Sequence, residues 1–318
     1  MKKILVTGAL GQIGSELTMG LRKIYGNDNV IASSRRTKEG HEDLMESGVF
    51  EIVNVTDGKQ LAEVIKKHKV NTIIHLAAIL SAVGEQNPAR AWDVNMNGLY
   101  NVLEVAREEN CAVFTPSSIA AFGDSTPKDN TPQDTIQRPN TMYGVTKVAG
   151  ELLCDYYYHK FGVDTRGVRF PGLISYETLP GGGTTDYAVH IYYDALKNKK
   201  YTSFIDKGTK MDMMYMPDAL NAITQLLEAD PSKLIHRNAF NVTAMSFEPE
   251  EIAASIKKVI PEFELDYDVD PVRQAIADSW PNSLDDSAAR EEWDWNPKYD
   301  LDAMTKDMLD KLKIKLGL

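Results

Sequence analysis

A glycine-rich turn stands between a predicted strand and a predicted helix near the start of the chain. The strand Ile4–Thr7 is apolar and partly β-branched, and the helical pattern Gln12–Tyr25 follows it. Gly8, Gly11 and Gly14 form the spacing G-x-x-G-x-x-G across this junction. Glycine permits close approach to a ligand, and the N–H groups that open a helix attract a pyrophosphate. The spacing predicts a dinucleotide cradle, although a glycine turn without a ligand is the alternative interpretation.

The first half of the chain alternates short β-branched runs with helical patterns. Further strands are expected at Val30–Ser33, Glu51–Asn54, Thr72–Leu76, Ala112–Pro116 and Thr165–Arg169, and further helices at Lys59–His68, Pro88–Glu109 and Tyr143–Phe161. Strands that alternate with helices indicate a parallel sheet covered by helices. The fold class expected is α/β, a doubly wound parallel sheet of the Rossmann type. Ligands of such sheets bind at the carboxyl ends of the strands.

The pattern becomes less regular after Pro171. A proline–glycine loop occupies positions 180–183, and helical patterns return at Asp186–Asn198, Pro217–Glu228, Glu250–Ile260 and Asp302–Leu316. We therefore expect a dinucleotide-binding domain over residues 1–172. Residues 173–318 are expected to form mainly a smaller C-terminal substrate-binding lobe, fused to the first domain.

Composition excludes several classes of function. The 318 residues are 43% apolar and 25% charged, and the formal net charge of −11 disfavours nucleic-acid and anionic-membrane surfaces. The most apolar stretch, Ile73–Val83, is too short to span a bilayer. Cys111 and Cys154 are the only cysteines, which argues against a zinc site or disulfide scaffold and fits the cytoplasm. The first expected strand begins almost at Met1, which leaves no room for a signal peptide. No metal site is expected.

A tyrosine and a lysine lie four residues apart in Tyr143-Gly-Val-Thr-Lys147, and Ser118 follows an expected strand upstream. On a helix, residues four apart share a face, so the ammonium can lie beside the phenol. A free tyrosine titrates near ~10, and a neighbouring cation and hydroxyl favour its phenolate. Each residue alone fits a structural role. Together with the glycine turn, the three predict a proton-transfer site beside a bound dinucleotide.

The end of the second strand bears on the choice of cofactor. Dinucleotide folds usually carry an acid here that holds the ribose hydroxyls, but this chain has Ser34, Arg35 and Arg36. Arginines at this point can accept the 2′-phosphate of NADP, or they can lie solvated beside the adenine; both interpretations stay open. Asn54 and Val55, after the third strand, are expected near the adenine.

These pieces resemble the extended short-chain dehydrogenase/reductase family. The matching motifs are the glycine turn, Ser118, Tyr143-x-x-x-Lys147 and the run Arg169-Phe-Pro-Gly172. Later segments are similar to the short-chain type of L-threonine 3-dehydrogenase: 171–175, 180–189, 211–216, 244–247 and 276–281. The resemblance covers essentially the whole chain. The family usually has an acid where this chain has Ser34, which leaves the cofactor preference open.

The resemblance implies a reaction and a set of residue roles. L-Threonine would be oxidised at C3 with hydride transfer to NAD, or to NADP. Tyr143 would be the general base, with Lys147 and Ser118 as its partners. The cofactor contacts expected are Gly8, Gly11, Gln12, Ile13, Gly14, Ser34, Arg35, Asn54, Val55, Leu76, Ala77, Ala78, Tyr143, Lys147 and Pro171. The threonine contacts expected are Ser81, Ser118, Tyr143, Thr184, Thr185, Asp186 and Trp280. A homodimer is also implied.

Two other functions use the same features. A nucleotide-sugar epimerase or dehydratase of the same superfamily would need basic groups for the sugar diphosphate, and no suitable arginine cluster follows Pro171. A non-catalytic dinucleotide-binding redox sensor would not need the tyrosine–lysine pair. For Asp186, pairing with the threonine ammonium and capping of the following helix are both compatible with the sequence.

Overall fold

The computed structural model describes residues 3–179, 181 and 183–318. The chain forms two compact units that are interleaved in the sequence. Unit 1 takes residues 1–121, 140–169 and 220–240, and unit 2 takes residues 122–139, 170–219 and 241–318. A single boundary was expected after residue 172. Residues 220–240 lie beyond that point in the sequence but belong to unit 1, and residues 122–139 lie before it but belong to unit 2.

Unit 1 is built on a six-stranded parallel sheet with the order β3-β2-β1-β4-β5-β7. Its strands are β1 (Ile4–Thr7), β2 (Val30–Ser34), β3 (Phe50–Ile52), β4 (Thr72–His75), β5 (Ala112–Phe114) and β7 (Thr165–Arg166). Strand order reverses at β1 and β4, where the carboxyl ends of the strands open a crevice for ligands. The predicted doubly wound α/β fold is confirmed.

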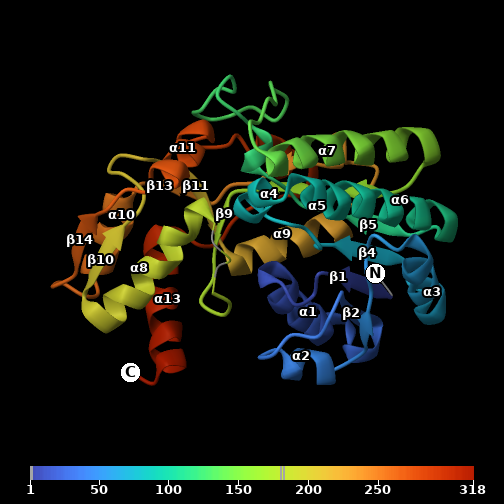
Figure 1. Ribbon diagram of the computed structural model, residues 1–318, viewed down its shortest axis with the longest axis horizontal. Helices are drawn as coiled ribbons and strands as arrows, with labels where there is room; N and C mark the ends of the chain where they lie inside the picture. Colours follow the sequence, from blue (N-terminus) through green and yellow to red (C-terminus); the bar gives the residue numbers. More distant parts are fainter. Residues whose placement is uncertain (1–2, 180, 182) are drawn as a thin grey trace. The chain divides into compact units, whose positions relative to one another are not determined.

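Helices cover both faces of this sheet (Figure 1). They are α1 (Gln12–Tyr25), α2 (Glu42–Glu46), α3 (Gly58–His68), α4 (Ser81–Gln86), α5 (Pro88–Trp92), a π-helical segment (Asp93–Asn97), α6 (Gly98–Glu109), α7 (Met142–Phe161) and α9 (Met216–Glu228), with short 3₁₀ turns at Asn27–Asn29 and Ile119–Ala121. The first residues of α9 belong to unit 2. One buried core joins the sheet to α3, α6 and α7 through residues such as Leu5, Ile73, Val102 and Cys154.

Local chemistry sets several helix ends in unit 1. The Asp57 carboxylate accepts hydrogen bonds from Lys59 N and Gln60 N at the start of α3. At the start of helix α7, Thr141 Oγ1 accepts a hydrogen bond from the N–H of residue 144. The helix ends at Gly162, which has a left-handed φ of 71°; glycine adopts this conformation easily because it has no Cβ. Such caps satisfy N–H and C=O groups that a helix end leaves unpaired. This explains why the expected bounds of these helices are close to the observed ones.

The region expected to form one helix, Pro88–Glu109, is instead three consecutive segments. Between α5 and α6, residues 93–97 form a π-helical turn. A π-turn inserts one extra residue per turn and changes which side chains face inward. It brings Asn95, which is 9% exposed, into the interior.

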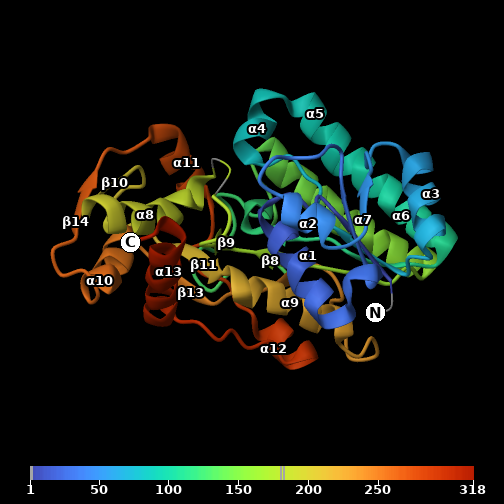
Figure 2. The same cartoon turned by 90° about the horizontal axis from the view of Figure 1, so that it is seen from below.

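Unit 2 contains two small sheets. The first has the order β13-β11-β9 and the second pairs β10 with β14. Its strands are β9 (Gly172–Ile174), β10 (Lys200–Ser203), β11 (Met211–Tyr215), β13 (Met245–Phe247) and β14 (Glu264–Tyr267). Its helices are α8 (Tyr187–Asn198), α10 (Pro249–Lys257), α11 (Pro271–Ser279), α12 (Ser287–Trp293) and α13 (Leu301–Leu316), with a 3₁₀ turn at Thr184–Asp186 before α8. Helices α8, α10 and α13 pack against one another (Figure 2).

Three short strands form a further sheet with the order β12-β8-β6, comprising β6 (Ser117–Ser118), β8 (Val168–Phe170) and β12 (Phe240–Asn241). The chain crosses from one unit to the other within β8 and β12. Helices α2, α4, α11 and α12 are observed but were not predicted as helices. No helix within the described part of the chain is both long and apolar enough to cross a membrane.

Candidate active site

The glycine turn after β1 leaves no room for a side chain on Gly8 or Gly14. Gly8 has a φ of +71°, and a Cβ on it would lie 2.8 Å from Ala77 N. A Cβ on Gly14 would lie 2.2 Å from Gly8 O. Gly11 is the N-cap of α1, and no side chain from the described residues caps that helix start. Its first N–H groups therefore remain available, and the cradle fits the pyrophosphate of a dinucleotide.

A pocket of about 190 Å³ lies in unit 1 beside this turn. Its lining includes seven of the expected cofactor contacts: Gly8, Ser34, Arg35, Asn54, Val55, Ala77 and Ala78. Arg90, at the start of α5, also lines the pocket and was not predicted. The residues that line the pocket include two arginines and no carboxylate. A pocket of this kind suits an adenosine.

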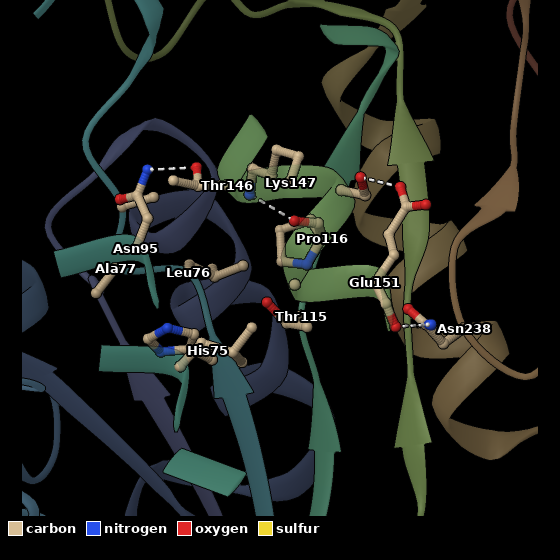
Figure 3. A pocket seen from close by; sticks show the side chains of 14 residues that line it. His75, Leu76, Ala77, Asn95, Thr115, Pro116, Thr146, Lys147, Glu151 and Asn238 are labelled. Carbon is tan, nitrogen blue, oxygen red and sulfur yellow. Dashed lines mark hydrogen bonds between the residues drawn. The ribbon is translucent and has the colours of Figure 1, made fainter. Parts of the chain in front are cut away.

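A smaller cavity of about 40 Å³ reaches in from the ends of β4 and β5 (Figure 3). It is lined by His75, Leu76, Ala77, Ala78, Asn95, Leu99, Thr115, Pro116, Ser117, Thr146, Lys147, Gly150, Glu151 and Asn238. Lys147 Nζ donates a hydrogen bond of 2.6 Å to Pro116 O, and Figure 3 shows this contact. The same Nζ lies 5.3 Å from the centroid of the Tyr143 ring. The expected tyrosine–lysine pair is thus brought together on one face of α7.

The other expected residues of unit 1 lie at strand and helix ends. Ser118 ends β6 and is partly buried, and its Oγ accepts a hydrogen bond of 3.2 Å from Ala120 N. Ser81 begins α4 and is 8% exposed. Gln12 and Ile13 open α1 directly after the cradle. Ser118 and Tyr143, both described in the structure, form no direct hydrogen bond with each other. Their joint action therefore stays a prediction.

His75 is a buried histidine, as the sequence analysis preferred. Its Nδ1 lies 2.8 Å from Thr7 Oγ1, and the ring is 4% exposed. Burial, aided by the nearby Lys147 charge, lowers the pKa of His75 to about 3. The imidazole that lines the cavity is therefore neutral. It adds no second positive charge beside Lys147.

An asparagine and a buried ion pair lie near Lys147. Asn95 Nδ2 donates to Ile79 O (3.0 Å) and to Thr146 Oγ1 (3.1 Å), which ties the loop after β4 to α7. Glu151 forms a buried, two-bond pair with Arg169, at 3.0 Å to Nε and 2.9 Å to the terminal nitrogen. Neither Asn95 nor Glu151 was predicted from the sequence. Glu151 could have been found, since it lies four residues beyond Lys147 on the same helix.

The expected residues of unit 2 gather around the start of α8. Thr184 is 3% exposed and Asp186 is 8% exposed, and both lie in the 3₁₀ turn before that helix. The Asp186 carboxylate accepts a hydrogen bond from Gly183 N, so it caps the turn. Thr185 packs closely on Gly172, where a Cβ would lie 2.7 Å from Thr185 Cγ2.

Two further expected contacts also belong to unit 2. Trp280, at the end of α11, is 8% exposed. Pro171 is buried. No group of three or more histidine, cysteine, aspartate or glutamate side chains among the described residues could hold a metal ion.

Comparison with known proteins places this chain in a family. Residues 4–242 match the NAD dependent epimerase/dehydratase family. An uncharacterized epimerase/dehydratase of Staphylococcus saprophyticus is 62% identical over 316 residues, which cover 99% of this chain and 98% of the relative.

Solved structures are similar over the whole length as well. L-Threonine dehydrogenase from Clostridium difficile is 71% identical with a TM-score of 0.98, over 99% of this chain and 98% of that one. A monomeric L-threonine 3-dehydrogenase from a metagenome is 45% identical with a TM-score of 0.93, over 99% of this chain and 100% of that one. The glycine cradle, the parallel sheet and these matches together show that the chain belongs to the NAD dependent epimerase/dehydratase family, within the extended short-chain dehydrogenases/reductases.

Proposed function

We propose that this chain oxidises L-threonine at C3 to 2-amino-3-oxobutanoate and passes the hydride to NAD(P). The observation that carries the proposal is the 71% identity, over nearly the whole chain, to an L-threonine dehydrogenase. The glycine cradle and the Tyr143–Lys147 pair support it, because the reaction needs a dinucleotide and a base in one crevice. Such an enzyme performs a step of threonine catabolism.

The chain's own residues handle the proton, and a nicotinamide held by the glycine cradle would supply the hydride acceptor. The Tyr143 phenolate takes the proton of the C3 hydroxyl. Lys147, held by Pro116 O, supplies the positive charge that favours the phenolate. Ser118 offers a hydroxyl to the developing carbonyl oxygen.

The groups of unit 2 would recognise the amino acid. Threonine carries an ammonium and a carboxylate, so its site needs an anion and several donors. Asp186 supplies the anion while it caps the turn before α8. Thr184 and Thr185 supply hydroxyls, Trp280 supplies an apolar wall, and Ser81 of unit 1 is proposed as a further contact.

The cofactor pocket supports use of NADP as well as NAD. Ser34 stands where an acid would repel a 2′-phosphate, and Arg35 and Arg90 line the same pocket. Neither arginine forms an ion pair with any described residue, so both charges are available to a ligand. We propose Arg35 as the main contact and Arg90 as its partner.

The outward faces of α6 and α7 support a homodimer. Tyr100 (50% exposed), Leu152 (63%), Tyr156 (52%) and Phe161 (43%) leave large apolar side chains open on these two helices. Surfaces of this kind mark contacts with a partner. We propose that a second copy covers them, although one solved relative is described as monomeric. The two free, buried cysteines fit a cytoplasmic protein.

The test is an initial-rate assay of the purified chain with L-threonine and each cofactor, read as reduced-nicotinamide absorbance. Threonine should give turnover, whereas nucleotide sugars should not. Turnover of a nucleotide sugar alone would favour an epimerase or dehydratase. Cofactor binding without turnover on any hydroxy amino acid would favour a redox sensor.

A further inference from the structure

The segment of residues 280–286 in unit 2 begins with Trp280 and joins α11 to α12. It contains no helical turn and only one β-bridge, between Leu284 and Thr131. Trp280 and Leu284 are nevertheless buried, at 8% and 4% exposed. Backbone polar groups that are buried outside regular structure need partners from elsewhere in the fold. The partners of this segment therefore decide where Trp280 lies.

The loop that contains Thr131 supplies some of these partners. Thr131 N donates to Ser283 O, and Asp285 N donates to Thr131 O, both at 2.9 Å. Asn282 N donates a hydrogen bond of 2.8 Å to Lys128 O. These bonds join two irregular stretches of chain. Neither stretch is fixed until a regular element holds one of them.

A buried carboxyl group on a strand holds the middle of the segment. Asp212, on β11, is 0% exposed, and its Oδ2 accepts a hydrogen bond of 2.7 Å from Leu284 N. Its Oδ1 accepts a hydrogen bond of 2.5 Å from Thr243 Oγ1. No cation among the described residues pairs with Asp212. Hydrogen bonds, and not an ion pair, therefore offset the cost of its burial.

A second side chain of the same sheet holds the segment beside Asp212. Strands β11 and β13 are antiparallel, and Asp212 lies directly opposite Ser246 in their ladder (Figure 1). Directly opposite residues point to the same face of a sheet. Ser246 Oγ donates a hydrogen bond of 2.6 Å to Asn282 O. One face of the sheet thus takes an N–H and a C=O of the segment, two positions apart.

The chemistry of Asp212 suggests which substitution preserves its contacts. Burial raises the pKa of Asp212 to about 8, so its neutral carboxyl group forms readily near neutral pH. The neutral group still accepts from Leu284 N, and it can donate to Thr243 Oγ1. Asparagine has the same shape and offers the same acceptor and donor. Leucine has a similar shape and offers neither.

We propose that Asp212 is a positioning residue for threonine recognition, which acts through the segment 280–286 to hold Trp280 as the wall of the substrate site. The inference rests on the proposed function, which assigns Trp280 to that site. Asp212 is fully buried and has no surface to offer the substrate itself. Its loss leaves Leu284 N buried without an acceptor, and the segment must shift to satisfy it. The wall then moves, and threonine binds less tightly.

A matched pair of leucine variants separates positioning from stability. Asp212→Leu removes the acceptor at similar side-chain volume, and Asp212→Asn restores it. Asp218→Leu is the control: Asp218 is 1% exposed in unit 2 and accepts from Lys298 N (2.9 Å) and Tyr299 N (3.0 Å). It therefore holds the chain between α12 and α13 and not the segment 280–286. Each protein is assayed for kcat and for KM with threonine, and thermal unfolding checks the fold.

The expected signature is a change in KM and not in kcat. KM for threonine should rise about 10- to 100-fold in Asp212→Leu, with kcat within about threefold, because a displaced wall weakens binding more than proton transfer. Asp212→Asn should keep KM within about threefold of the parent. Asp218→Leu should lose a similar amount of thermal stability with KM unchanged. An unchanged KM in Asp212→Leu, or an equal rise in both leucine variants, would overturn the proposal.

A double variant tests the route through Trp280. Once Trp280→Ala has removed the wall, Asp212→Leu should raise KM little further, because residues that act through one another are not additive. Effects that multiply would show that Asp212 acts elsewhere. Should Asp212→Leu fail to fold, Asp212→Ala takes its place, and a KM within about twofold of the parent refutes the role. Absence of threonine turnover in the parent would reject the proposed function itself, whereas failure of the KM predictions alone would leave that function intact.

Discussion

The ammonium of Lys147 lies 5.3 Å from the centroid of the Tyr143 ring. Its position is held by a backbone carbonyl, Pro116 O, just beyond the end of β5. One helix therefore supplies both of the side chains proposed to react, and the neighbouring strand end sets where the charge sits. An ammonium beside a phenol favours the phenolate, which is the form needed to accept the hydroxyl proton of a substrate.

Replacing the proposed base should abolish most turnover. We expect Tyr143→Phe to lower kcat about 10²- to 10⁴-fold, since it removes the proton acceptor and little else. Cofactor affinity, followed by fluorescence quenching, should change little. A phenylalanine variant that folds and keeps near-normal turnover would contradict the role of Tyr143.

Restoring an acid at the end of β2 should shift cofactor use toward NAD. Ser34→Asp places a negative charge where the 2′-phosphate is proposed to lie, so kcat/KM with NADP should fall about 10- to 100-fold. Kcat/KM with NAD should hold or rise. Arg35→Ala should weaken NADP binding and spare NAD, which titration of each cofactor can measure. Equal use of both cofactors in the parent and in Ser34→Asp would reject this assignment.

Acid should destabilise unit 1 partly through His75. Burial lowers the pKa of His75 to about 3, whereas an unfolded histidine titrates near ~6.5. The unfolded state thus binds more protons between these values, so the contribution of His75 is fully present above pH ~6.5 and is lost as pH falls toward ~3. Urea unfolding of His75→Asn should depend less steeply on pH over this range. His159→Gln, an exposed change on α7, is the control and should follow the parent curve.

Breaking the buried ion pair near the cavity should cost far more stability than breaking an exposed one. Glu151 and Arg169 are 5% and 7% exposed in their side chains. Removal of one partner leaves a buried charge uncompensated, so Glu151→Ala should lower the free energy of unfolding by about 3–5 kcal/mol. Glu262→Ala, which breaks the exposed pair with Lys199, should leave the unfolding midpoint almost unchanged. Equal midpoints for the two variants would contradict this account.

A charge on the apolar face of α7 should dissociate the proposed dimer. Leu152 is 63% exposed there, and Leu152→Glu would bury a carboxylate in the interface. Light scattering after size exclusion should report a dimer for the parent chain and a monomer for the variant. Ile314→Glu is the matched control, because Ile314 is 80% exposed on α13 of unit 2. A monomeric parent chain would reject the proposal, in agreement with the monomeric relative.

Local patterns predicted the parts of the fold that local chemistry controls. The strand Ile4–Thr7 and the helix Gln12–Tyr25 are observed with the expected bounds. The glycines between them serve close backbone approach, which their spacing already indicated. The tyrosine–lysine contact was equally predictable, because a helix places residues four apart on one face.

Other features depend on packing between distant segments. A π-turn interrupts the helix expected at Pro88–Glu109, and it turns Asn95 inward to hold the loop after β4. Arg90, on α5, joins Arg35, which follows β2, at one pocket only because segments distant in the sequence pack together there. Neither outcome has a signal in the local sequence.

By itself, the sequence of this protein determined the alternation of strands and helices, the glycine cradle and the face of α7 that Tyr143 and Lys147 share, since each depends on backbone conformation or helical spacing over a few residues. Only the tertiary structure decided what surrounds Lys147. Asn238 lies 91 positions beyond it in the numbering, on a strained turn, yet both line one cavity. The physical reason is that burial, charge compensation and hydrogen-bond satisfaction depend on every segment that meets at a point, and not on the order of residues along the chain.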